Sequence, residues 1–281
     1  MTPPEAPSAL PPGGAASGPA EPVSRRPLGL QPGHLEVQAL VKRFGGLLAT
    51  DQLSMTLEPG EIHAVIGPNG AGKTTLIHQL SGEIAPDAGR IVFNGRDITH
   101  EPPYRRALAG MGRSYQITSV FPEFTVLQNL CLAVQAHSGH SFRFWRPAAS
   151  ERRLREPAER ALEQVGLAAR AATPVAELAH GERRQLEIAM TLATDAKLLL
   201  LDEPMAGMSH AESEDVVALL QKLKGKHTIL LVEHDMDAVF SLADRITVLV
   251  YGRALACGTA EQIRANDEVR DAYLGQQEES L

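Results

Sequence analysis

A stretch of ten residues, Ile66 to Thr75, has the residue types and spacing needed to bind the phosphates of a nucleotide. It reads IGPNGAGKTT and fits the pattern G-x-x-x-x-G-K-[ST]. The glycines let the backbone curl so that successive N–H groups point at phosphate oxygens. The lysine can reach the outer phosphates, and the hydroxyl of the next residue can bind magnesium. We therefore predict a nucleoside triphosphate site formed by Gly67, Pro68, Asn69, Gly70, Ala71, Gly72, Lys73, Thr74 and Thr75.

The segments on either side of this loop are of the kind that positions it. An apolar run from Ile62 to Ile66 predicts a buried strand before the loop, and Leu76, Ile77 and Leu80 predict a helix after it. The start of that helix adds the positive end of its dipole to the phosphate site. A chance glycine-rich turn would lack this strand–loop–helix context, so we interpret the motif as a phosphate loop.

Three further polar residues have the types that triphosphate hydrolysis needs. Asp202 ends an apolar strand and suits a magnesium ligand, and Glu203 beside it suits a general base for water. His234 follows the next apolar strand and suits contact with the γ-phosphate. Polar groups at the carboxyl ends of parallel strands lie where open α/β sheets build their sites. We therefore predict one catalytic edge of a sheet.

The composition excludes several function classes. The net charge of -7 disfavours general binding to nucleic acid. Cys131 and Cys257 lie far apart and lack metal-ligand spacing, which fits a reducing cytoplasmic setting. No apolar run approaches the roughly 20 residues that span a bilayer, and the N-terminal residues lack the charged start and apolar core of a secretory signal. A protein of this composition that serves a membrane would do so from the aqueous side.

The chain divides into a tail and a folded part. Residues 1–34 are rich in Pro, Gly, Ala and Ser, and we predict a disordered tail. The following 60 residues or so predict mostly strands, with a turn at 42–46 and a hairpin-type turn at 59–60. Residues 101–175 predict helices and loops, and the last third of the chain predicts an α/β pattern. Expected strands are 35–41, 53–57, 62–66, 89–95, 197–204, 228–235 and 245–251; expected helices are 127–136, 152–165, 211–224 and 261–273.

An aromatic and basic loop lies between the first two of these helices, at residues 137–147. His137 and His140 lack a third ligand nearby, so we interpret them as polar loop residues rather than a metal site. The mixture of arginine and aromatic residues fits contact with a membrane headgroup layer or a protein partner, and it equally fits a solvated loop.

From about Leu35 to about Gly275 the chain resembles an ATP-binding subunit of an ABC transporter. The resemblance rests on the phosphate loop, the Leu-Asp-Glu-Pro segment at 201–204, the Glu-His-Asp segment at 233–235 and a signature-like segment at 178–182. It implies that Phe44 stacks on adenine and that Gln116 binds magnesium and meets the membrane subunit. The signature segment, which in the family acts on the partner's ATP, is formed here by Leu178, Ala179, His180, Gly181 and Glu182.

The family fold implied by this resemblance is α/β, a P-loop ABC-type ATPase. It has a RecA-like core, an antiparallel β subdomain and a helical subdomain at about 101–180, all within a domain spanning 35–275. Residues 276–281 would then form a C-terminal tail. A signature so far along the chain from its own phosphate loop must act across an interface, so we expect two such subunits to stack head to tail.

Two residues depart from the usual family pattern. Ala179 stands where the family has a serine whose hydroxyl reaches the γ-phosphate, and Ser209 stands where an acid or amide is usual. The backbone N–H groups at the start of the helix that follows Ala179 can still bind phosphate. We expect these departures to affect the rate of turnover and not the class of protein.

Within the family, several segments look most like the ATPase subunits of branched-chain amino-acid importers: 43–49, the insertion at 137–150, the alanine of the signature with 186–189, and the ending at 273–275. This resemblance implies ATP and Mg2+ as cofactors. It also implies two membrane permeases, a second ATPase subunit and a solute-binding protein as partners, with no nucleic acid, and a peripheral place on the cytoplasmic face of the inner membrane.

Importers of urea, short amides or another amino acid share parts of this pattern, as do lipopolysaccharide exporters. A soluble regulatory ATPase is the alternative from another class, although it usually has two fused cassettes or a coiled-coil insertion. A nucleotide-binding module without turnover is disfavoured by Glu203 and His234.

Overall fold

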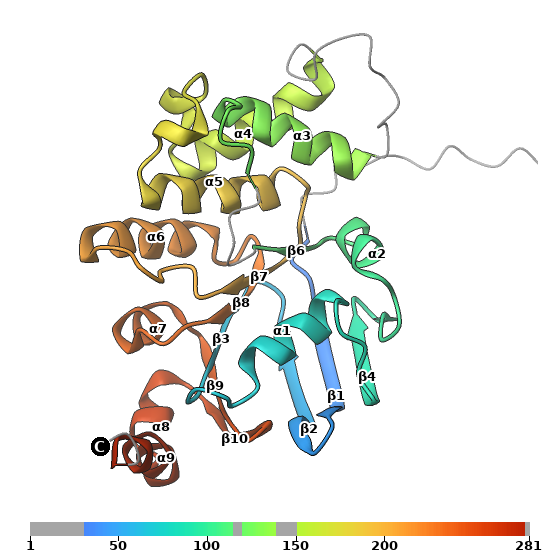
Figure 1. Ribbon diagram of the computed structural model, residues 1–281, viewed down its shortest axis with the longest axis vertical. Helices are drawn as coiled ribbons and strands as arrows, with labels where there is room; N and C mark the ends of the chain where they lie inside the picture. Colours follow the sequence, from blue (N-terminus) through green and yellow to red (C-terminus); the bar gives the residue numbers. More distant parts are fainter. Residues whose placement is uncertain (1–30, 115–119, 139–150, 279–281) are drawn as a thin grey trace, which may run out of the picture.

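The computed structural model describes residues 31–114, 120–138 and 151–278 (Figure 1). The tail predicted for residues 1–34 lies outside the described residues up to residue 30, as do Gln116 and residues 139–150 of the aromatic and basic loop. Within the described residues, no helix combines the length and apolar character needed to cross a membrane.

A mixed, mostly parallel sheet forms the centre of the molecule. Within the described residues it has six strands in the order β10-β9-β3-β8-β7-β6, and we call it the larger sheet. Strand β10 runs antiparallel to β9, and the other neighbours are parallel. The strands are β3 (Ile62–Ile66), β6 (Met111–Arg113), β7 (Leu198–Asp202), β8 (Thr228–Val232), β9 (Arg245–Val250) and β10 (Arg253–Gly258). Strands β3, β7 and β8 are buried throughout, as their apolar runs predict.

An antiparallel sheet, the smaller sheet, packs beside the larger one. Its described strands follow the order β2-β1-β4-β5 and are β1 (Leu35–Phe44), β2 (Leu47–Leu57), β4 (Ala88–Phe93) and β5 (Arg96–Asp97). The turn predicted at 42–46 is shorter in the structure, because Phe44 still pairs with Leu47 across the hairpin. The hairpin-type turn predicted at Pro59-Gly60 is wrong: β2 belongs to the smaller sheet and β3 to the larger, so this turn changes sheets.

The helices lie in two groups. Helices α3 (Val126–Ser138), α4 (Arg152–Val165) and α5 (His180–Leu192) form a helical lobe at the top of Figure 1. The others surround the sheets: α1 (Lys73–Ser81), α2 (Pro103–Leu108), α6 (His210–Leu223), α7 (Met236–Leu242), α8 (Ala260–Arg264) and α9 (Asp267–Glu278). The expected helices at 127–136, 152–165 and 211–224 are confirmed to within two residues.

The structure differs from the sequence prediction at several boundaries and by one additional strand. Strand β6 belongs to the larger sheet, so the helical lobe begins after it rather than near residue 101. The single helix expected at 261–273 is two helices, α8 and α9, and α9 continues to Glu278, past the tail boundary at 276. Strand β10 was not predicted. Its sequence RALACG is exposed along most of its length and lacks the alternation that marks a half-buried strand.

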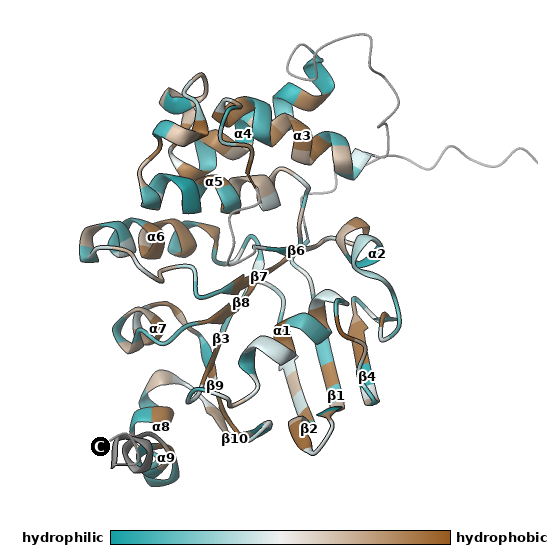
Figure 2. Ribbon diagram, in the orientation of Figure 1, coloured by the Kyte–Doolittle hydropathy of each residue, from teal (hydrophilic) through white to brown (hydrophobic). Residues whose placement is uncertain are grey.

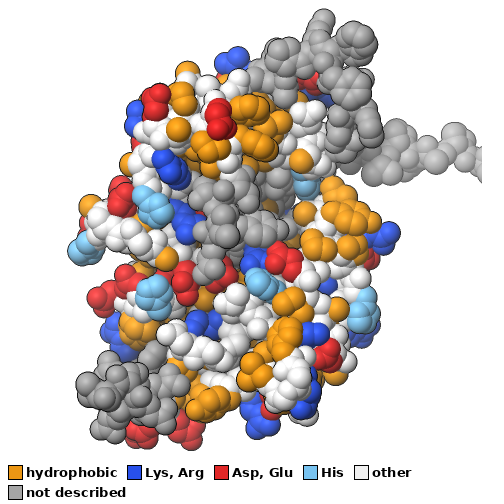
Figure 3. Space-filling model, viewed as in Figure 1, with side chains coloured by type: hydrophobic (Ala, Val, Ile, Leu, Met, Phe, Trp, Pro, Cys, Tyr) orange, Lys and Arg blue, Asp and Glu red, His pale blue; other side chains and the backbone are white. Residues whose placement is uncertain are grey.

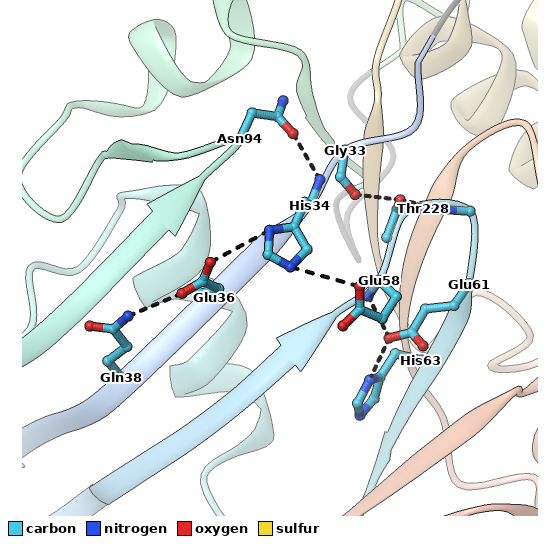
Figure 4. Close-up of polar contacts among 10 residues, drawn as sticks. Gly33, His34, Glu36, Gln38, Glu58, Glu61, His63, Asn94 and Thr228 are labelled. Atoms are coloured by element: carbon cyan, nitrogen blue, oxygen red, sulfur yellow. Dashed lines mark hydrogen bonds and ion pairs between the residues drawn. The ribbon is translucent and has the colours of Figure 1, made fainter.

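The folded chain also begins before the predicted boundary at residue 34. The N–H of Gly33 donates to the carbonyl of Lys197 at 3.0 Å, and the hydroxyl of Thr228 donates to the carbonyl of Gly33 at 2.5 Å. The N–H of His34 donates to Oδ1 of Asn94 at 2.8 Å (Figure 4). These contacts tie the entry of the chain to both sheets.

Hydrophobic burial explains why these layers stay together. One cluster of buried side chains joins the helical lobe to β7, β8 and α6, a second fills the space between the two sheets and α1, and a third lies under α7, α8 and α9. Figure 2 shows the central strands of the larger sheet in brown, the colour of hydrophobic residues. Fully burying one such side chain stabilises the fold by about 1.5–3 kcal/mol.

Candidate functional site

The phosphate loop connects β3 to α1, and its glycines are required by close contacts. A Cβ on Gly67 would lie 2.1 Å from the carbonyl oxygen of Leu249, and one on Gly72 would lie 2.2 Å from that of Ala49. Gly72 also caps α1 with a left-handed φ of 103°. The backbone therefore takes the curled course that the pattern predicts, with the first turn of α1 directly after it.

Lys73 is folded back over its own loop. Its Nζ donates to the carbonyl of Gly67 at 2.6 Å and to that of Pro68 at 2.9 Å. Burial lowers the pKa of Lys73, against the nearby carboxylates of Glu203 and Asp202, which raise it. The structure thus brings the loop lysine, Asp202 at the end of β7 and Glu203 directly after it within electrostatic reach of one another. Thr74 is exposed on the first turn of α1, so its hydroxyl is accessible to a ligand.

Asp202 ends β7 and is 2% exposed. Its Oδ2 lies 3.9 Å from a guanidinium nitrogen of Arg113. Its Oδ1 is buried and has no hydrogen-bond partner in the described part of the chain. Burial raises the pKa of Asp202, although the charge of Arg113 lowers it. A buried acceptor without a donor is costly, and a bound cation would satisfy it.

Glu203 occupies a strained turn after the strand. Its φ is 48°, which is uncommon for a residue other than glycine. Its N–H donates to the carbonyl of Val232 at 2.8 Å, so the turn is fastened to the neighbouring strand β8. The side chain is half-buried and therefore reachable by water. Backbone strain of this kind is common at functional sites.

His234 and Glu233 follow β8, and they differ sharply in exposure. The His234 side chain is 66% exposed, and its Nδ1 lies 3.7 Å from Oε2 of Glu233. Glu233 is 1% exposed. It accepts the N–H of Met205 at 2.8 Å and that of His234 at 3.0 Å. Glu233 therefore joins the loop after β7 to the loop after β8, a role that the sequence analysis did not assign.

The signature segment begins α5. Leu178 is buried, whereas Ala179 and His180 are exposed, and Ala179 caps the helix without a side-chain acceptor. Glu182 Oε2 accepts the N–H of Ala179 at 3.0 Å, and an ion pair joins Glu182 to Arg170 at 2.9 Å. These contacts leave the exposed face of the helix start available to a partner molecule.

Glu212 on α6 contacts the same helix start, and sequence reasoning missed it. Its Oε1 accepts the N–H of Gly181 at 3.0 Å. Its Oε2 accepts the N–H of Ser209 at 3.0 Å and the Ser209 hydroxyl at 2.7 Å. Hydrogen bonds from Ser209 and then Gly181 lower the pKa of Glu212. An acid three residues after a capping serine indicates a capping box, but the contact with Gly181 has no sequence signal.

The structure does not bring every predicted site residue together. Phe44 ends β1 as a ring that is 46% exposed, with Nζ of Lys42 5.5 Å from its centroid. Helix α5 lies in the helical lobe and is well separated from α1 (Figure 1). The signature therefore does not lie at the phosphate loop of its own chain. No cluster of three or more His, Cys, Asp or Glu side chains suited to a metal occurs within the described residues.

Residues 50–206 match a protein-family model described as ABC transporter. Residues 255–279 match a second model, described as branched-chain amino acid ATP-binding cassette transporter. These two matches cover most of the folded chain.

Individual relatives agree with the family models. The chain is 42% identical to the high-affinity branched-chain amino acid transport ATP-binding protein BraF of Pseudomonas aeruginosa, over 86% of this chain and 98% of that one. It is 40% identical to LivG of Escherichia coli K12, which carries the same description, over the same shares. Among solved structures, a nucleotide-free ATP-binding cassette from an ABC transporter superposes with a TM-score of 0.76 at 29% identity, covering 86% of this chain and 98% of the other.

Proposed function

Because this chain belongs to the ABC transporter family of ATP-binding proteins, we propose that it is the ATP-hydrolysing subunit of an importer for branched-chain amino acids. Membership of this family means that the chain is an ATPase coupled to transport. The observation that carries the proposed chemistry is the buried, unpartnered Oδ1 of Asp202, in the described part of the chain, beside the lysine of the phosphate loop.

Mg2+ is the cation that fits this position. Mg2+ in nucleotide sites is usually held by one or two protein oxygens together with substrate phosphates and water. Asp202, Thr74 and Gln116 would hold it, and Lys73 would pair with the β- and γ-phosphates. The absence of a three-ligand cluster in the described residues agrees with a cation that depends on phosphate for its remaining ligands.

Glu203 is the proposed general base. Its carboxylate would accept a proton from the attacking water, and the turn fastened to Val232 holds it at the end of β7. The exposed His234 would contact the γ-phosphate, and Phe44 would stack on adenine. The backbone N–H groups of the curled loop and the start of α1 would stabilise the phosphate charge.

A second ATPase subunit would complete each site. The helix start at Ala179 and Gly181 is separated from the phosphate loop of its own chain, so a partner placed head to tail would present the start of its α5 to the γ-phosphate. Segment 178–182 is exposed at Ala179 and His180, which suits this contact.

The permeases would dock in the groove between the helical lobe and the larger sheet. A pocket of about 480 Å³ lies there, with a lining that includes Tyr104, Leu108, Val120, Ala133 and Met190. Tyr104 and Leu108 are 61% and 58% exposed on α2. Figure 3 shows hydrophobic side chains gathered over α2. An exposed apolar patch of this kind commonly marks a protein interface. The proposed permease contact would hold the protein at the cytoplasmic face of the inner membrane, with a solute-binding protein acting through the permeases.

The test is transport-coupled ATPase activity in proteoliposomes. The chain would be co-reconstituted with the permeases, the second ATPase and the solute-binding protein of the proposed importer. We expect leucine, isoleucine or valine, bound to that protein, to stimulate ATP hydrolysis, and Lys73→Ala to abolish the response. Stimulation by urea or short amides alone would contradict the proposed solute. Activity that responds to DNA or ribosomes and not to the permeases would contradict the transport role.

A further inference from the structure

A row of polar side chains links an exposed thiol to a buried histidine in a part of the larger sheet that the proposed ATPase chemistry does not use. The row runs from Cys257 on β10 through Thr247 on β9 and His63 on β3 to Glu61, which precedes β3. Cys257 and Thr247 are direct cross-strand partners. Strands β9 and β3 are parallel neighbours. The three adjacent strands β10, β9 and β3 therefore hold these side chains next to one another across the sheet.

The distances in this row are those of hydrogen bonds. Nδ1 of His63 lies 3.1 Å from Oε1 of Glu61, and its Nε2 lies 2.8 Å from the Thr247 hydroxyl. The Thr247 hydroxyl lies 3.4 Å from Sγ of Cys257. His63 is 0% exposed, whereas Cys257 is exposed to solvent. Figure 4 shows Glu61 and His63 directed at each other.

This arrangement allows a proton to leave the thiol. An ionised carboxylate can only accept, so Nδ1–H of His63 donates to Glu61 and Nε2 faces Thr247. In the neutral form, the thiol donates to the Thr247 hydroxyl, which donates to Nε2. A proton shift along these two hydrogen bonds gives an imidazolium that donates to Thr247 and a thiolate that accepts from it. A nucleophile, a base and a group that orients the base are the parts of an activated nucleophile.

The charges around the row favour the ionised form. Burial lowers the pKa of His63, but its interactions with Cys257 and Glu61 outweigh burial and raise the pKa above its usual value. Interaction with His63 lowers the pKa of the Cys257 thiol, against burial, and the Thr247 hydroxyl and the charge of Arg245 lower it further.

Four of the charged side chains on the elements packed against β10 have partners of their own. Asp51 of β2 pairs with Arg253, Glu261 of α8 accepts the Thr259 hydroxyl, Arg264 of α8 lies over the ring of Phe240, and Arg270 of α9 pairs with Asp267. His63, Thr247 and Arg245 are the groups that lower the pKa of Cys257.

We propose that Cys257 is a modification site, activated by His63 through Thr247 for reaction with small disulfides. In this reaction the thiolate attacks one sulfur of the disulfide, the disulfide S–S bond breaks, and a mixed disulfide forms on Cys257. The leaving thiolate ends as a free thiol with the proton that Cys257 lost. Cys257 is oxidised and the small disulfide that it attacks is reduced, so no further oxidant is needed. This inference does not depend on the proposed transport function.

The test compares the two cysteines of the full-length reduced protein by peptide mass spectrometry. With 2-hydroxyethyl disulfide at neutral pH, we expect a mixed disulfide on Cys257 and none on Cys131. Cys131 is a matched internal control, because it is fully buried and burial raises its pKa to about 11. With iodoacetamide, we expect the rate at Cys257 to reach half its maximum below the pH of about 8.5 that is typical of a free cysteine.

Variants separate the effect of the hydrogen-bonded row from the effect of the charge near Cys257. His63→Gln and Thr247→Val should both raise the midpoint pH, at which the iodoacetamide rate at Cys257 reaches half its maximum. Arg245→Gln should raise this pH less. Cys257→Ser should lose the adduct. A wild-type midpoint at or above 8.5 would overturn the proposal even if His63→Gln does not fold. If Arg245→Gln raises the midpoint pH more than Thr247→Val does, the row is not the cause of the low midpoint of Cys257.

Discussion

The carboxylate of Glu212 accepts the backbone N–H of Gly181 at 3.0 Å, so an anion already sits at the start of the signature helix. Glu212 is also packed closely there, since a Cβ on Gly181 would lie 3.1 Å from its Cγ. The N–H groups of a helix start attract negative charge, whether from a carboxylate or a phosphate. In the proposed paired state, a partner's γ-phosphate and Glu212 would compete for this position.

Glu212→Gln should therefore ease pairing of the ATPase subunits. The amide retains an acceptor but loses the charge that competes with phosphate. In the hydrolysis-blocked Glu203→Gln background, we expect pairing at a lower ATP concentration, measured by sedimentation. Glu214→Gln is the matched control, because this residue lies on the same helix with its side chain 71% exposed. Equal effects of the two changes would point to net charge instead.

Lys73→Ala should abolish ATP hydrolysis while the fold persists. The substitution removes a charge-assisted contact with the outer phosphates, and losses of at least about 100-fold are typical for such groups. ATPase rate and circular dichroism would be measured together, with exposed Lys222→Ala as the charge control. Activity within a few-fold of wild type would contradict the role given to Lys73.

Glu203→Gln should retain ATP binding and lose hydrolysis by at least about 100-fold, because the amide cannot accept a proton from water. Nucleotide titration and single-turnover rates separate the two effects. Asp235→Asn is the control, since Asp235 accepts the N–H groups of Asp237 and Ala238 as the cap of α7 and asparagine can also cap. If the Asp235 variant were the inactive one, the base would be Asp235.

Two truncations should differ in stability. Removal of residues 1–30 should leave the melting temperature unchanged, because that composition cannot bury enough apolar surface to order itself. Removal of residues 1–34 should cost about 1–3 kcal/mol of the free energy of unfolding, because the hydrogen bonds of Gly33 and His34 to both sheets are lost. Thermal unfolding of both proteins, side by side, tests this. Similar melting temperatures would show that the entry of the chain contributes little.

Ala179→Ser should stabilise the protein and tighten ATP-dependent pairing. Ala179 is the N-cap of α5 and has no side-chain acceptor, whereas a serine hydroxyl could accept an N–H of the first turn, worth roughly 1 kcal/mol. The same hydroxyl could donate to a partner's γ-phosphate. Thermal unfolding without ATP reports the first effect, and sedimentation in the Glu203→Gln background reports the second. A change in stability alone would mean that position 179 does not contact the nucleotide.

Local sequence determined the parts of this protein that depend on near neighbours. Lys73 and the loop glycines lie within one short segment, and apolar runs before Asp202 and His234 predict buried strands that end in polar residues. The hydrophobic effect buries such runs as strands of one parallel sheet. The polar residues that follow these strands therefore lie at the same edge of the sheet.

Tertiary structure alone decided the contacts between residues far apart in the chain. Gly181 and Glu212 belong to different helices, and His63 and Thr247 are separated by 184 positions. No periodicity predicted β10, because an exposed edge strand has no buried face to impose alternation. Hydrogen-bond partners of this kind are set when strands and helices pack, since packing and not sequence spacing brings a donor within about 3 Å of its acceptor.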